Sequence, residues 1–352
     1  MNEEKVGIMK KLLALMMTMA LTLSLAACGG SETEAPAEEP AAAEDAAAEE
    51  PAEETDGTVY KIGVLQYVQH AALDQSNAGF FAALDDAGIS YEADQQNAAG
   101  EAASCDTIAD TLVNNGSDLI LAIATPAAQA VAGKTSDIPI VLTAVTDPAE
   151  SGLVESNDAP GGNVTGTSDL TPVKEQMDLL MEILPETKTV GILYCSAEAN
   201  SVLQADMAKE ALDALGVAYE DYTVSSSNEI QTVVESAVGK VDALYAPTDN
   251  MIAAGMATVG MVANENGIPV ICGEEGMVNE GGLATYGIDY YELGYLAGQQ
   301  AIEILTNGAN PAEIAIGYLA AENCALTVNM ETVEALEAAG LDLTALKAKA
   351  EQ

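Results

Sequence analysis

Short polar residues gather along this chain where apolar runs end. Hydroxyl, amide and carboxylate side chains follow runs such as 61–67 and 189–194 and open longer amphipathic stretches. In a parallel sheet the carboxyl ends of the strands meet at one edge, and ligands bind in the loops there. Hydroxyls and helix-start N–H groups could hold a carboxylate, and Asp147, Asp249 or Asp289 could hold an ammonium. The predicted ligand-binding residues are Gln69, His70, Thr125, Thr146, Asp147, Ser168, Ser196, Glu198, Asn200, Thr248, Asp249, Asn250 and Asp289. Asp169 and Glu274 occupy loops of the same kind.

Each of these residues also has a purely structural explanation. Ser, Thr, Asp and Asn are the usual N-caps of helices, so any one of them could serve only to start a helix. Tyr67, Tyr194 and Tyr245 stand at strand ends, where they could stack on a ligand ring or belong to the core. Because the polar residues form a set along one edge of two predicted sheets, we favour ligand binding for the set.

Composition excludes several functions. The formal net charge is −45 and the chain has no arginine, so the basic face that nucleic acids require is missing. A bidentate guanidinium clamp on a ligand carboxylate is also impossible. His70 is the one histidine, and neither HExxH nor CxxC occurs, so we expect no metal site and no cofactor. The cysteines other than Cys28 are widely scattered, and buried thiols explain them better than disulfides do.

A repeated unit underlies the predicted elements. The segment 62–74 and its continuation 83–92 match 190–202 and 211–220 at a constant offset of 128 residues, with nine identities over 31 aligned positions. A duplicated strand–helix–strand unit implies two similar α/β lobes facing each other across a cleft, where small ligands usually bind. The alternative is that any two such units look alike.

Short apolar runs alternate with amphipathic stretches, as in α/β proteins with buried parallel strands. The predicted strands are 61–67, 91–94, 119–124, 140–145, 189–194, 218–222, 243–246, 270–272 and 324–329. The predicted helices are 72–87, 102–114, 126–131, 172–183, 200–215, 229–238, 250–265, 291–307 and 331–339. Segments 163–170 and 283–289 are predicted to cross between the lobes. We therefore predict an α/β fold of two Rossmann-like lobes, with parallel sheets flanked by helices and joined by a crossover hinge.

The front of the chain indicates export and anchoring. Two lysines precede an apolar run over 12–27, which is typical of a secretory signal. The run ends in Leu25-Ala26-Ala27-Cys28, which resembles the bacterial lipobox and predicts lipidation of Cys28. The alternative is ordinary cleavage beside a stray cysteine. The acidic, Ala/Pro-rich stretch that follows cannot bury enough apolar area to fold and reads as a tether.

These observations give a domain organisation and a location. The predicted parts are a signal peptide (1–27), the lipidated Cys28 with its tether (28–57), lobe 1 (58–169 plus 287–311) and lobe 2 (170–286 plus 312–352). We expect an extracytoplasmic monomer, anchored by lipid to the outer face of the cell membrane.

Several motifs carry a resemblance to a known family. They are V-Q-H-A-A-L-D (68–74), I-A-T-P-A-A-Q (123–129), T-A-V-T-D-P (143–148), N-V-T-G-T-S-D (163–169), P-T-D-N (247–250) and G-I-D-Y-Y-E-L-G (287–294). Together they resemble the tryptophan/tyrosine-type substrate-binding lipoproteins of ABC transporters, over nearly all of residues 60–330. The resemblance implies a type I periplasmic-binding fold with three crossovers, capture of an amino acid of aromatic type, and delivery to a membrane permease. The chain departs from the pattern at Ala71-Ala72, where a proline is expected.

The predicted function is therefore capture of a small ligand by hinge closure in an extracytoplasmic lipoprotein. An enzyme is disfavoured because Cys195, which a two-cysteine racemase would need to pair, corresponds to Tyr67 in the other repeat. A sugar-repressor-like transcription factor would need a basic DNA-binding front, which this chain lacks. The alternatives left open are a ligand-sensing receptor lipoprotein, or a binding protein for another amino acid, a nucleoside or a sugar.

Overall fold

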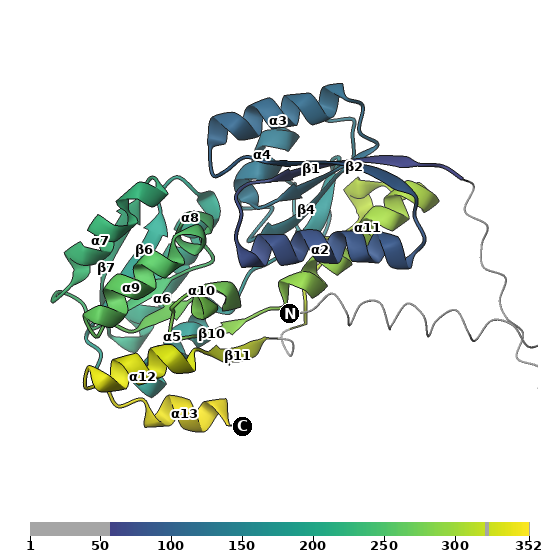
Figure 1. Ribbon diagram of the computed structural model, residues 1–352. Helices are drawn as coiled ribbons and strands as arrows, with labels where there is room; N and C mark the ends of the chain where they lie inside the picture. The colour runs from purple at the N-terminus through teal and green to yellow at the C-terminus, as the bar shows by residue number, and fades with distance from the viewer. Residues whose placement is uncertain (1–56, 321–323, 352) are drawn as a thin grey trace, which may run out of the picture. The chain divides into compact units, whose positions relative to one another are not determined.

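The computed structural model describes residues 57–320 and 324–351. The predicted signal peptide, Cys28 and the tether up to residue 56 lie outside the described residues. The described residues form two β-sheets, each flanked by helices (Figure 1). Within them, no helix is both long enough and apolar enough to cross a membrane.

The first sheet has five parallel strands in the order β2-β1-β3-β4-β5. Its central strands β3 and β4 are buried along their whole length, whereas the edge strand β2 is mostly exposed. This is why the central strands read as continuous apolar runs in the sequence. The strands are β1 (Tyr60–Gln66), β2 (Tyr91–Asn97), β3 (Leu119–Ile123), β4 (Ile140–Val145) and β5 (Val164–Ser168).

Helices cover both faces of the first sheet, with α2 and α11 on one face and α3 and α4 on the other (Figure 1). The α2 and α11 helices approach so closely that a Cβ atom at Gly294 would lie 1.9 Å from the Ser76 carbonyl oxygen. Only glycine fits there. We call this sheet and its four helices the first lobe: α2 (Ala71–Asp86), α3 (Ala102–Asn114), α4 (Thr125–Ala132) and α11 (Tyr290–Asn307).

The second sheet has six strands in the order β11-β10-β9-β8-β6-β7, and only β11 is antiparallel to its neighbour. Its strands are β6 (Thr189–Cys195), β7 (Ala218–Val224), β8 (Ala243–Ala246), β9 (Val270–Cys272), β10 (Ala284–Gly287) and β11 (Ala325–Val328). Its helices are α5 (Val173–Ile183), α6 (Ala199–Leu215), α7 (Ile230–Ala237), α8 (Asn250–Ala254), α9 (Met256–Glu265), α10 (Glu275–Asn279), α12 (Met330–Ala338) and α13 (Thr344–Ala350). We call this group the second lobe.

The two parallel sheets repeat one topology. Counted within each lobe, the strand order is second, first, third, fourth and fifth, and β11 is an addition to the second lobe. The predicted α/β fold with two Rossmann-like lobes is thus confirmed. The cysteines of the described residues are free thiols, and Cys105, Cys195 and Cys272 are buried.

A few predicted elements differ from the structure. The predicted helix 250–265 is broken at Gly255, whose backbone at φ −109° and ψ 10° leaves the helical conformation, so α8 and α9 are separate helices. The predicted crossovers 163–170 and 283–289 each contain a strand, β5 or β10, that ends just before the chain changes lobe. The last helix, α13, was not predicted.

The chain passes between the lobes three times. It leaves the first lobe after β5, returns after β10 and leaves again after Gly317, which bridges to Thr167 in β5. The predicted lobe boundaries stay a proposal.

Candidate functional site

A small cavity lies where the carboxyl ends of the strands of both sheets meet. Its volume of about 10 Å³ is close to what one water molecule needs. Both lobes line it, as expected for a site at the carboxyl edges of two facing sheets. The lining residues are His70, Leu73, Ala144, Thr146, Asp169, Asn200, Thr248, Asp249, Asn250, Ala253, Glu274 and Tyr290.

Two hydrogen bonds join the lobes across this cavity. His70 Nε2 of the first lobe lies 3.3 Å from Asn250 Oδ1 of the second. Gln204 Nε2 of the second lobe donates to Thr146 Oγ1 of the first over 3.2 Å. Since the lobes bond directly to each other, anything larger than water requires them to separate or their side chains to rearrange.

Two of the buried acids, Asp249 and Glu274, accept hydrogen bonds from backbone N–H groups with both carboxylate oxygens. Asp249 caps α8, with Oδ1 accepting from Ile252 N over 2.8 Å, while Oδ2 accepts from Cys195 N at the end of β6. Glu274 caps α10 and accepts from the backbone N–H groups of Gly276 and Met277. Burial raises the pKa of Glu274 to about 7, and these two N–H donors oppose the shift.

Asp169 and Glu198 are different, because each has one oxygen without a partner. Tyr290 Oη donates to Asp169 Oδ2 over 2.8 Å, but Asp169 Oδ1 is buried without a hydrogen bond. Asn200 and Asn250 both donate to Glu198 Oε2, while Glu198 Oε1 is buried and unpartnered.

The electrostatics of both acids follow from burial. It raises the pKa of Asp169 to about 6, against the opposing hydrogen bond from Tyr290. Burial, and then the nearby charge of Asp249, hold the pKa of Glu198 well above its usual range. The lysine ion pairs among the described residues lie elsewhere, on partly exposed side chains. The cavity therefore offers acceptor oxygens to a cationic donor and supplies no cation of its own.

His70 is a neutral ring at physiological pH. Burial lowers its pKa to about 4, and the hydrogen bond to Asn250 and the charge of Asp74 only partly oppose the shift. Its Nδ1 atom is buried and has no hydrogen-bond partner.

The structure brings together six of the residues predicted from the sequence and places the others outside the cavity. Ser196, Asp289 and Gln69 are exposed, and Asp289 caps α11 by accepting from the N–H groups of Tyr291 and Glu292. Those lining the cavity are His70, Thr146, Asn200, Thr248, Asp249 and Asn250.

The remaining predicted residues are buried or half-buried near the same edge. Asp147 accepts from backbone N–H groups and from Asn157, so its carboxylate organises its own loop. Ser168 donates to the Thr146 carbonyl over 2.6 Å. Thr125 starts α4, and its buried hydroxyl has no partner. Glu198 does not line the cavity and is held by Asn200 and Asn250, which do.

The predicted set omitted several residues that the fold brings to the cavity. Asp169 and Glu274 follow strand ends, and the sequence placed them in loops of the same kind, although the predicted set left them out. Tyr290 and Gln204 lie within helices, and only the fold shows that they reach this edge. Tyr67, Tyr194 and Tyr245 are buried and absent from the cavity wall, which supports the core alternative for them.

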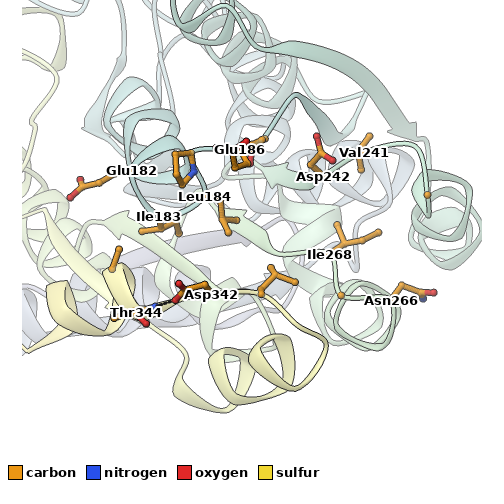
Figure 2. A pocket seen from close by; sticks show the side chains of 16 residues that line it. Glu182, Ile183, Leu184, Glu186, Val241, Asp242, Asn266, Ile268, Asp342 and Thr344 are labelled. Carbon is orange, nitrogen blue, oxygen red and sulfur yellow. Dashed lines mark hydrogen bonds between the residues drawn. The ribbon is translucent and has the colours of Figure 1, made fainter.

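A larger hollow of about 940 Å³ lies at the opposite edge of the second sheet, before the strands begin (Figure 2). Apolar side chains such as Ile183 and Ile268 form much of its wall. Asp342 accepts from Thr344 N, and Asp242 from the backbone of Lys188 and Thr189, so these acids serve local structure. Size alone does not make it the ligand site, because no unpartnered polar atoms converge on it among the described residues.

Sequence comparison assigns the family. The family described as ABC transporter substrate binding protein matches residues 61–344. The chain belongs to this family. It is a substrate-binding protein of an ABC transporter, which works outside the cytoplasm with a membrane permease, and it is not an enzyme.

Individual relatives agree with this assignment. The tyrosine-binding protein of Clostridioides difficile (strain R20291) is 42% identical over 280 residues, 78% of this chain and 80% of that protein. A solved structure from Streptococcus pneumoniae in complex with L-Trp is 36% identical, with a TM-score of 0.77, and covers 80% of this chain and 95% of that one. A ligand-free, open structure of a substrate-binding protein with adhesive properties from Clostridium difficile is 40% identical, with a TM-score of 0.61. The match covers 79% of this chain and 95% of that one. The predicted family and the type I periplasmic-binding fold are confirmed.

Proposed function

We propose that this substrate-binding protein captures an aromatic amino acid between its lobes and delivers it to its permease. The observation that carries the proposal is a pair of buried, unpartnered oxygens near a cavity that has no cation in its wall. Asp169 Oδ1 belongs to a wall residue, and Glu198 Oε1 lies on a carboxylate that the wall residues Asn200 and Asn250 hold. A buried acceptor without a donor is costly, and an ammonium group supplies three donors and a positive charge. The relatives that bind tyrosine and tryptophan support the same ligand class.

The ammonium partners differ from those expected from the sequence. Asp249 was a candidate, but both of its oxygens are taken by backbone N–H groups. Asp147 and Asp289 serve as loop and helix caps. We assign the ammonium to Asp169 and Glu198, and the ligand carboxylate to the first lobe, where the Thr125 hydroxyl and the start of α4 lack side-chain partners.

Ligand entry is proposed to require hinge opening. At similar identity and coverage, the chain superposes better on the tryptophan complex than on the open, ligand-free relative. The direct bonds between the lobes and the water-sized cavity fit a closed arrangement. Closing around a ligand would exclude water and present the permease with one defined shape.

Calorimetric titration of the purified protein tests this function. L-tryptophan and L-tyrosine should bind, while their analogues lacking the amino group should bind at least about tenfold more weakly, since the buried acids would then stay unpaired. Glu198→Gln and Asp169→Asn should weaken amino-acid binding, and the exposed control Ser196→Ala should not. Binding of sugars or nucleosides alone would refute the aromatic assignment.

Anchoring through Cys28 and a monomeric state complete the proposal. Mass spectrometry of the protein extracted from membranes should detect a lipid on Cys28, and light scattering should give the mass of one chain. An unmodified Cys28 would disprove the lipid anchor without affecting ligand capture.

A further inference from the structure

A chain of hydrogen bonds runs from the second lobe into the first. Asn250 Nδ2 donates to Glu198 Oε2, and Asn250 Oδ1 lies 3.3 Å from His70 Nε2. Asn250 is buried at the start of α8, and His70 directly precedes α2. Asn250 therefore links an acid of one lobe to the histidine of the other.

This series of hydrogen bonds determines which His70 nitrogen carries the proton. Glu198 is an acceptor for the Asn250 amide nitrogen, so the Asn250 oxygen is the atom that faces His70. A carbonyl oxygen can only accept, and therefore Nε2 must donate. A neutral imidazole with its proton on Nε2 has a bare lone pair on Nδ1.

Both ends of this series of hydrogen bonds are then acceptors that lack a donor. Glu198 Oε1 is one end and His70 Nδ1 is the other, and both atoms are buried. The low pKa of His70, about 4, keeps the ring neutral, so Nδ1 stays an acceptor at physiological pH. Buried unpaired acceptors are rare in folded proteins and point to a missing partner.

Space for a ligand side chain adjoins His70. A hollow of about 250 Å³ also borders His70, and His70, Ala253 and Glu274 line both this hollow and the cavity. Three alanines, Ala253, Ala254 and Ala257, give it a small apolar wall from α8 and α9. A planar ring could pass along this wall while its far end reaches His70.

We propose that His70 is a specificity-determining residue, whose Nδ1 accepts a hydrogen bond from the phenol or indole donor of the ligand side chain. This inference rests on the proposed function. It predicts that tyrosine and tryptophan are preferred over phenylalanine, because a phenyl ring leaves His70 Nδ1 buried and unpaired. The ammonium occupies the Glu198 end of the hydrogen-bond chain, and the side-chain donor occupies the His70 end.

The test is the ratio of dissociation constants, measured by calorimetry on the whole protein. Tyrosine should bind about tenfold or more tightly than phenylalanine or 4-fluorophenylalanine, which has nearly the same shape and no donor. In His70→Phe this ratio should fall to within about twofold, since the acceptor is gone. Met261→Ala, an exposed change on α9 that lies outside the walls of both the hollow and the cavity, should keep the wild-type ratio.

The outcomes separate this inference from the proposed function. Equal affinity of the wild-type protein for tyrosine, phenylalanine and 4-fluorophenylalanine would overturn the role of His70 and leave amino-acid capture intact. An unchanged ratio in His70→Phe would also overturn it. No binding of any aromatic amino acid would refute the proposed function, and this inference with it. The wild-type comparison needs no variant, so it stands even where His70→Phe does not fold.

Discussion

The two lobes share one strand order but organise their ligand-facing edges by different means. In the second lobe, buried carboxylates accept the N–H groups there: Asp249 caps α8 and Glu274 caps α10. In the first lobe, the N-cap residue of α4 is Ala124, which has no side chain that can cap the helix. The starts of α8 and α10 are therefore satisfied by second-lobe side chains, whereas the start of α4 in the first lobe leaves N–H donors for a ligand.

The first lobe also carries backbone strain at this edge. The described non-glycine residues with positive φ are Ala99, Ala124 and Ala144, and all three lie at the carboxyl ends of first-lobe strands. Ala124, at φ 83° and ψ 154°, is in a region that almost only glycine adopts. Such strain persists only where the surrounding structure enforces it, as it does at many binding sites. The difference suggests that one lobe holds its loops by capping and the other by packing.

The largest expected effect comes from removing a carboxylate of the second lobe. Asp249→Ala leaves the buried N–H groups of Cys195 and Ile252 without their acceptor, which should lower the free energy of unfolding by about 2–4 kcal/mol. The matched first-lobe change is Thr125→Ala, whose hydroxyl has no partner to lose, and it should cost below about 1 kcal/mol. Urea denaturation measures both. Equal losses would erase the contrast between the lobes.

A smaller effect concerns pH. Burial raises the pKa of Asp169 to about 6 and of Glu274 to about 7, and it also raises that of Glu198. The folded state therefore binds more protons than the unfolded state from about pH 4 to 7, and these groups' contribution to stability falls as pH rises through that range. His70, with its pKa lowered to about 4, acts in the opposite direction below about pH 6.5.

The clearest window is thus above pH 6.5, where His70 no longer contributes. Between pH 6.5 and 8 the free energy of unfolding should fall by about 1 kcal/mol per pH unit while a buried acid titrates. The melting temperature should fall with it. Glu274→Gln should flatten this slope, and the exposed neighbour Glu275→Gln should leave it unchanged. A slope insensitive to Glu274→Gln would mean that this acid does not titrate there.

The smallest expected effect is a gain in the free energy of unfolding. Ala124→Gly relieves a strained conformation and should raise the free energy of unfolding by about 1 kcal/mol, after the entropy of the more flexible residue is subtracted. The control Ala128→Gly, in the buried interior of α4, should lose about 1 kcal/mol. Chemical denaturation of both variants checks the signs. A loss at Ala124 would argue against strain as the device of the first lobe.

Much of the fold could be predicted because buried parallel strands appear in the sequence as short runs of apolar residues. β3, β4 and β8 are buried on both faces and stand out in the sequence. The break between α8 and α9 was missed, because a single glycine inside a helical pattern is often tolerated and the pattern does not give the backbone conformation of Gly255. α13 was missed because its seven residues carry little apolar periodicity and end the chain.

The site was predictable at the level of loops and not of atoms. Position after a strand led to His70, Thr146 and Asn250, which the fold brings together in the cavity wall. It could not tell Asp249, whose oxygens are both used by the backbone, from Asp169, which keeps one free. That difference depends on hydrogen-bond geometry, which position in the sequence does not encode.

The return of α11 to the first lobe has a consequence for how the protein comes to be folded. Its close packing on α2 joins residues more than 200 positions apart, as Tyr295 Oη and Asp86 Oδ2 show at 3.1 Å. During synthesis the first lobe cannot be completed until nearly the whole chain has emerged, and contacts of such long range slow folding. A protein that works across a membrane from its ribosome gains from that delay, since a chain that folds late remains threadable through a translocation channel.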